Sequence, residues 1–201
     1  MEGIVIVLRD CLGTVSDYAL ASLIFTGLFA ITYLYVKEHG LKNTILQIKN
    51  ELMQHKEFRL KCVFIFVCFM IADRTILGRT GWVYPLTNPI GNWGIYTSDG
   101  SFNFDLFENI VLFIPLIAML PVAFPNVLKG RKHNLWKSIS RLTLIGFICS
   151  LSIETTQLLL RLGKFQFSDM FFNTVGGLIG AVIWRAYYKF ISIRRSIPVI
   201  H

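Results

Sequence analysis

The chain has 201 residues, of which 54% are hydrophobic, and it carries a formal net charge of +8 at pH 7. Its mean hydropathy is +0.56, and the apolar residues come in long blocks that contain few charges. In a soluble helical protein each helix would be apolar along one stripe only, so this pattern argues against that class. The positive charge lies mainly between the apolar blocks, and nucleic acid is therefore not an expected partner.

Five apolar segments approach the ~20 residues that a helix needs to cross a bilayer. In chain order they cover residues 18–36, 60–77, 104–124, 142–160 and 170–188. The third contains Pro115 and Pro121, which remove backbone hydrogen bonds and can bend a membrane helix. The predicted fold class is all-α: a polytopic transmembrane helix bundle with about five spans.

Two connecting segments have distinct compositions. Residues 37–59 place Leu41, Ile45, Ile48 and Leu52 at helical spacing with lysines between them, which predicts an amphipathic helix in the membrane interface. Residues 78–103 are rich in Gly, Pro, Asn and Trp, which predicts turns and a loop able to fold over the bundle. The predicted organisation is an N-terminal part over 1–59 with the first span and the basic helix, a transmembrane domain over 60–193, and a tail over 194–201.

Charge is divided unequally between the two sides of the predicted bundle. Most of the 20 basic residues lie in 37–61, 129–141 and 185–195. The opposite side carries only Arg9, Arg74, Arg79, Arg161 and Lys164, together with most of the 12 acidic residues. The positive-inside rule then predicts an amino terminus outside and a carboxyl terminus in the cytoplasm. The basic segments can also contact anionic lipid headgroups.

Polar residues gather near the predicted outer ends of four helices, within roughly 10 Å along the bundle. They are Arg74, Glu108, Asn109, Glu154, Gln157, Arg161, Asp169 and Asn173. Glu154, Gln157 and Arg161 share one helical face, as do Asp169 and Asn173. We expect the deepest carboxylate, Glu154, to pair with Arg161 or Arg74. The set can form a ligand-binding pocket or an ion-pair network that only holds the helices together.

Below this polar set, Gly176, Gly177 and Gly180 predict close helix packing, with the 142–160 helix as the expected partner. No histidine lies near the polar set to act as a base, so no catalytic residue is predicted. The four cysteines form no metal-binding pattern with histidine, and neither a disulfide nor a metal site is expected. No cofactor is predicted.

Two stretches resemble the motifs of the VanZ-like family of bacterial integral membrane proteins. The first is Glu108-Asn109-Ile110 followed by Phe113-Ile114-Pro115. The second joins Ser152-Ile153-Glu154, Gln157-Leu158 and Arg161 to Asp169, Asn173-Thr174 and Gly176-Gly177-Leu178-Ile179-Gly180. Either Arg74 or Arg79 can match an arginine that the family places after an earlier span. The resemblance covers about residues 60–184, which leaves the first span and the basic segment outside it.

The resemblance implies a multi-pass protein of the bacterial cytoplasmic membrane that acts at its outer face. The member that gives the family its name is associated with lowered susceptibility to the glycopeptide antibiotic teicoplanin. The main hypothesis is therefore binding or modulation of an amphiphile, either a lipid-linked envelope intermediate or a lipoglycopeptide, with membrane lipids as further partners. The alternatives are a membrane enzyme that uses Glu154 or Asp169 as general acid or base, and a structural scaffold. The sequence indicates no oligomeric state.

Overall fold

The computed structural model describes residues 19, 21–35, 37, 41–78, 84, 86–96, 100–130 and 134–196. In these ranges the secondary structure is helical apart from loops, and an isolated antiparallel bridge joins Tyr96 to Phe102. The chain divides into two compact units. The first draws on residues up to 87 and on 156–165, and the second on 88–155 and from 166 onward.

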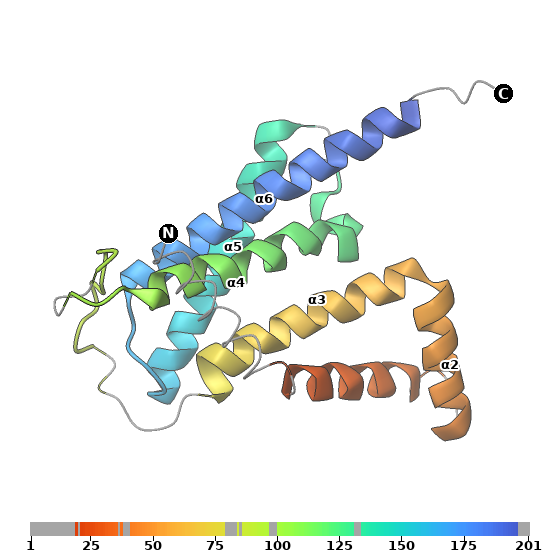
Figure 1. Ribbon diagram of the computed structural model, residues 1–201, viewed down its shortest axis with the longest axis horizontal. Coiled ribbons are helices and arrows are strands. Elements are labelled where there is room, and N and C mark those ends of the chain that lie inside the picture. Colours follow the sequence, from red (N-terminus) through yellow and green to blue (C-terminus); the bar gives the residue numbers. More distant parts are fainter. Residues whose placement is uncertain are drawn as a thin grey trace. The chain divides into compact units, whose positions relative to one another are not determined.

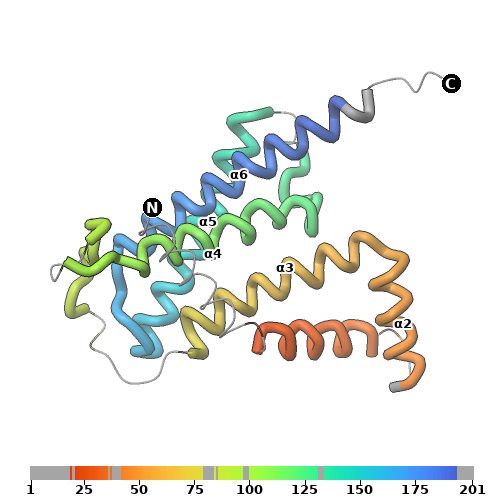
Figure 2. Tube along the Cα trace, in the orientation of Figure 1, coloured from red at the N-terminus to blue at the C-terminus, as the bar shows by residue number. Residues whose placement is uncertain are grey.

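The first unit is built on an antiparallel pair of helices, Ala21–Tyr35 and α3 (Lys56–Ala72). The rings of Phe25 and Phe69 stack with centroids 5.1 Å apart, and those of Tyr33 and Phe58 lie 6.2 Å apart at the other end. Figure 2 shows the two helices side by side. Leu34 and Phe58 belong to the buried core of this unit, against which Ile48 of α2 (Leu41–Gln54) packs.

The single helix predicted over residues 37–59 is interrupted. Helix α2 ends at Gln54, and α3 begins at Lys56. His55 between them has an extended backbone. Arg59 stabilises the break, since its Nη1 donates to the carbonyl oxygens of Leu52 at 2.7 Å and Met53 at 3.0 Å. These carbonyls at the end of α2 have no partner within their own helix. The basic segment therefore forms two helices rather than one.

The second unit holds α4 (Phe104–Ala123), η2 (Pro125–Leu128), α5 (Leu135–Leu160) up to Thr155, and α6 (Phe167–Ser196). Gly176 and Gly180 of α6 lie against Ile110 and Ile114 of α4, so these two helices run in the same direction. Figure 1 shows them side by side. Ser150 of α5 contacts Asn173, and Gly146 faces Gly177, so α5 runs antiparallel to α6. Successive crossings of a membrane would run in these directions.

The partner of the glycine stripe is not the predicted one. A Cβ at Gly176 would overlap the carbonyl oxygen of Ile110, and one at Gly180 would overlap that of Ile114, so both face α4 rather than α5. Of the three glycines Gly177 alone also reaches α5, since a Cβ there would lie 3.5 Å both from Cα of Gly146 and from Cγ1 of Ile117 in α4. Small residues show that a backbone comes close but not which helix supplies it. Helix α4 remains continuous through Pro115 and Pro121.

Several helices extend beyond the predicted spans. Helix α5 begins at Leu135, ahead of residue 142, because Oδ1 of Asn134 accepts the N–H of Lys137 at 2.9 Å and caps the helix. Helix α6 runs from Phe167 to Ser196, beyond both ends of 170–188. Hydropathy marks only the part of a helix that lies in hydrocarbon, whereas caps and polar residues fix the helix ends.

Among the residues that the structure describes, three helices are long and apolar enough to cross a membrane: α4, α5, and α6 over Phe167–Ile193. The Ala21–Tyr35 helix is apolar but shorter. Helix α3 has 17 residues and is continued by the 5-residue π-helix η1 (Asp73–Leu77), which ends where the predicted second span ends. The all-α membrane fold is confirmed, and the count of five spans and their orientation stay predictions.

The predicted orientation can be tested by cysteine labelling. We expect Asn92→Cys to react with a membrane-impermeant maleimide added to intact cells, and Lys129→Cys to react only after the cells are opened. Both side chains are exposed and lie in loops, and the native cysteines would first be replaced by alanine. Labelling of Lys129→Cys in intact cells, with Asn92→Cys protected, would reverse the orientation drawn from the charge distribution.

Candidate functional site

The eight polar residues singled out in the sequence divide between the two units. Glu108, Asn109, Glu154, Asp169 and Asn173 belong to the second unit, and Arg74, Gln157 and Arg161 to the first. Arg79, the other arginine that can match the family motif, lies outside the described residues. In the second unit the parallel pair α4–α6 and the antiparallel pair α5–α6 bring the five residues to one end, where α4 and α6 begin.

Glu154 accepts a hydrogen bond from the start of α6. Its side chain is only 2% exposed, and Oε2 lies 2.9 Å from the backbone N of Gln166. The next two N–H groups of α6 donate to the loop before α4, Phe167 to the Pro89 oxygen at 2.9 Å and Ser168 to the Ile90 oxygen at 3.3 Å. The first N–H groups of a helix have no partner inside it and favour a negative charge nearby. Glu154 therefore contributes to the cap of α6.

The loop over residues 88–96 folds onto the same helix end. Gly91 has a positive φ of 78°, and a Cβ there would overlap Oγ of Ser168. Trp93 packs on Phe171 and Phe172 of α6, with ring centroids 5.2 and 5.9 Å away. Only glycine combines this backbone conformation with so close an approach. This part of the predicted external loop thus covers the beginning of α6.

Asn173 makes the main polar contact between α5 and α6. Its Nδ2 donates to Oγ of Ser150 at 2.9 Å, and both residues are buried. Hydrogen bonds of this kind hold membrane helices together. One turn earlier, Asp169 lies in the first turn of α6 and its Oδ1 accepts a weak bond of 3.4 Å from Oγ of Ser168. Glu108 and Asn109 are half-buried in the first turns of α4.

Gln157 joins the last turn of α5 to η1 within the first unit. Its side chain is 1% exposed, and Nε2 donates to the carbonyl oxygen of Thr75 at 2.8 Å. Its Oε1 is buried and has no hydrogen-bond partner among the described residues. A π-helix departs from α-helical pairing and recurs at functional sites. Arg74 belongs to this π-helix, next to the carbonyl that Gln157 binds.

Arg161 follows α5 in a conformation that suits glycine. Its φ is 55°, the only positive value for a non-glycine residue in the described ranges. The N–H of Leu162 donates to the carbonyl oxygen of Gln157 at 3.1 Å, which closes the helix end as a Schellman motif does. A side chain in the left-handed region costs roughly 1–2 kcal/mol relative to glycine. The chain therefore holds an arginine where helix-end geometry favours glycine.

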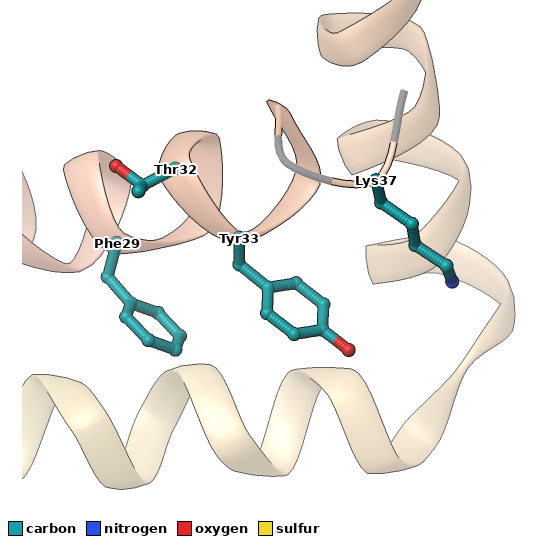
Figure 3. A pocket seen from close by; sticks show the side chains of 4 residues that line it. All are labelled: Phe29, Thr32, Tyr33 and Lys37. Carbon is teal, nitrogen blue, oxygen red and sulfur yellow. The ribbon is translucent and has the colours of Figure 1, made fainter. Parts of the chain in front are cut away.

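A cavity of about 380 Å³ lies along the Ala21–Tyr35 helix of the first unit. Its lining residues are Phe29, Thr32, Tyr33 and Lys37. In Figure 3 the rings of Phe29 and Tyr33 point toward the facing helix, whereas Thr32 points away from it. The cavity combines aromatic rings with one lysine, and none of the eight predicted residues lines it.

Sequence reasoning missed several partners of the predicted residues. Ser150 and Thr75 looked like ordinary span residues, and the N–H of Gln166 is a backbone group that no side-chain pattern reveals. The turn at Gly91 could have been predicted, because an asparagine, Asn88, stands three residues before the glycine. In the structure Oδ1 of Asn88 accepts the Gly91 N–H at 3.2 Å. In the part of the chain that the structure describes, no three His, Cys, Asp or Glu side chains gather as a metal site would require.

Comparison with known proteins identifies the family. No curated protein and no solved structure matches the chain significantly. The family model described as VanZ/LLP1 matches residues 18–190, which include the first predicted span and the basic segment that the motifs alone had left outside. The match covers most of the chain and contains all eight polar residues. The chain therefore belongs to the VanZ/LLP1 family.

Proposed function

We propose that this membrane protein binds an amphiphilic cell-envelope ligand with an anionic group, at the outer face of the bacterial cytoplasmic membrane. The ligand is a lipid-linked envelope intermediate or a lipoglycopeptide. The observation that carries the proposal is Arg161 in a left-handed conformation, one turn after the buried amide of Gln157. Unfavourable backbone geometry persists where a side chain is needed in that place.

The chemistry of this helix end suits a phosphate or carboxylate group. Guanidinium groups bind such anions with two parallel hydrogen bonds. Arg161 follows the turn that Gln157 fixes to Thr75, and Arg74 neighbours Thr75 in η1. The buried Oε1 of Gln157 adds an acceptor for a donor group on the ligand. The apolar helices beside these arginines can contact a lipid chain. Lipid-linked envelope intermediates and lipoglycopeptides both combine a lipid chain with a polar group.

The family's association with glycopeptide resistance agrees with this proposal. Teicoplanin is a lipoglycopeptide, so it offers an acyl chain and ionisable groups of the kinds just described. A protein that holds the antibiotic, or the lipid-linked intermediate on which it acts, would alter its access to the envelope. This role needs recognition of the ligand and no chemical step.

The Arg161→Gly variant separates a binding role from a structural one. Glycine relieves the left-handed strain, so we expect the free energy of unfolding to rise by about 1 kcal/mol. We expect binding of a polyprenyl phosphate to fall at least tenfold, because a charge-assisted bidentate contact is lost. Native mass spectrometry and thermal unfolding of the full chain in detergent measure both quantities. Teicoplanin is the second probe.

Arg161→Lys is the matched control for charge, since lysine keeps the cation but not the planar fork. We expect it to bind the phosphate more strongly than Arg161→Gly does, without the gain in stability. If Arg161→Gly is stabilised and binds both probes as the wild type does, Arg161 has no role in recognition. The proposal then fails.

A further inference from the structure

A second cavity of the second unit begins at the first turn of α5 and reaches α6 at Thr174 and Leu178. It has a volume of about 450 Å³ and follows α5 from Trp136 to Phe147, roughly 16 Å along the helix axis. Its lining includes Ser140 and Leu144 of α5, and Thr174 and Leu178 of α6. Volumes of this size are typical of sites for small ligands. We refer to this cavity as the α5–α6 groove.

The groove opens on the outer surface of two helices that can cross a membrane. Leu144 is 55% exposed and Leu178 is 42% exposed, so both offer apolar surface to the hydrocarbon. Trp136, 77% exposed, lies in the first turn of α5, and tryptophan is enriched where the hydrocarbon meets the headgroups. The groove therefore starts at one membrane interface and continues toward the middle of the bilayer.

The charged side chains that the second unit itself places at the Trp136 end are all basic. The sequence contains no acidic residue from Asn109 to Ile153, and none from Met170 to the carboxyl terminus. The basic residues in these stretches whose side chains the structure describes are Lys129, Lys137, Arg141, Arg185 and Lys189. Because α5 and α6 are antiparallel, the first turns of α5 and the last turns of α6 lie at the same end of the unit.

From this arrangement we infer that the α5–α6 groove holds an acyl chain of an anionic phospholipid, with the phosphate beside Lys137. The basic end is the one that the positive-inside rule assigns to the cytoplasm, where anionic lipids attract Lys and Arg. This lipid site is separate from the ligand site proposed above. Its lining contains none of the eight polar residues.

Native mass spectrometry of the full-length protein with added phosphatidylglycerol or phosphatidylcholine tests the inference. We expect the wild type to retain phosphatidylglycerol at least fivefold more strongly than phosphatidylcholine. Ser140→Trp fills the groove from an exposed position and should lower phosphatidylglycerol retention about tenfold. Ile148→Trp is the matched control, since Ile148 is 51% exposed on α5 and does not line the groove. It should retain the lipid.

Lys137→Gln tests the headgroup contact without altering the groove. We expect it to lower phosphatidylglycerol retention about fivefold and to leave phosphatidylcholine unchanged. Equal retention of the two lipids by the wild type overturns the inference. So does equal retention by Ser140→Trp and Ile148→Trp. A dimer that Ser140→Trp abolishes, with no lipid retained, would assign the groove to a second copy of the chain instead.

Discussion

Replacing Gly176 by alanine is expected to destabilise the protein by about 1–3 kcal/mol, the usual cost of overpacking an interior. A Cβ at this position would overlap the carbonyl oxygen of Ile110, which is backbone and cannot rotate away. The α4–α6 pair would have to separate or shift. Gly180→Ala should act similarly, through the carbonyl oxygen of Ile114. Reversible unfolding in mixed micelles measures the change in free energy.

Gly177→Ala is the control that makes this test decisive. A Cβ at Gly177 would meet Cα of Gly146 and Cγ1 of Ile117 at 3.5 Å, which is ordinary van der Waals contact. Alanine also has a helix propensity about 1 kcal/mol better than glycine, so this variant should be neutral or slightly stabilised. If Gly176→Ala is as stable as Gly177→Ala, the result contradicts the close packing of α4 against α6 at Gly176.

The helices could be predicted from sequence because hydrophobicity on all sides is a local property. Each predicted span coincides largely with a helix: the second ends at Leu77 as η1 does, and the third begins at Phe104 as α4 does. Which helices pack against each other could not be predicted from the sequence in the same way. Gly176 and Gly177 are neighbours in sequence, yet one faces α4 and the other also reaches α5, because successive residues point about 100° apart around a helix.

In the candidate site, too, contacts within one helix could be predicted from the sequence, whereas contacts between distant segments could not. Ser152 and Thr155 make local contacts, since their hydroxyls donate to the oxygens of Ile148 and Leu151 four residues earlier at 2.8 and 2.7 Å. For Glu154 the sequence predicted an arginine partner and did not reveal the N–H of Gln166, which is a distant backbone donor. Charge suggests side-chain partners, whereas an open helix end offers donors that only the fold brings near.

Several polar residues of the second unit therefore act as supports for helix ends and helix contacts. Glu154 caps α6, Asn173 joins α6 to α5, and the loop containing Gly91 and Trp93 covers the same helix end. In the first unit, Gln157 binds Thr75 through one end of its amide and leaves Oε1 without a partner among the described residues. The proposed recognition therefore uses the helix end with Arg161, whereas the hydrogen bond that Glu154 accepts from Gln166 caps α6.

Glu154→Gln is expected to keep the fold nearly intact, whereas Glu154→Leu should lower the free energy of unfolding by about 1–3 kcal/mol. Glutamine retains a side-chain oxygen that can accept the N–H of Gln166, now 2.9 Å from Oε2. Leucine has a similar volume but no acceptor, so it leaves a donor unpaired at the start of α6. Unfolding in mixed micelles and hydrogen exchange of the first turn of α6 measure the difference.

Glu154→Gln, together with Asp169→Asn, also decides between binding and catalysis. A general acid or base loses its function when its carboxyl group becomes an amide, while a capping residue does not. We therefore expect Glu154→Gln to bind a polyprenyl phosphate as the wild type does, and Asp169→Asn to behave alike. A stable Glu154→Gln protein that binds the probe but has lost its effect in cells would assign Glu154 to proton transfer. Because glutamine matches glutamate in size and the variant protein is stable, loss of stability cannot account for such a result.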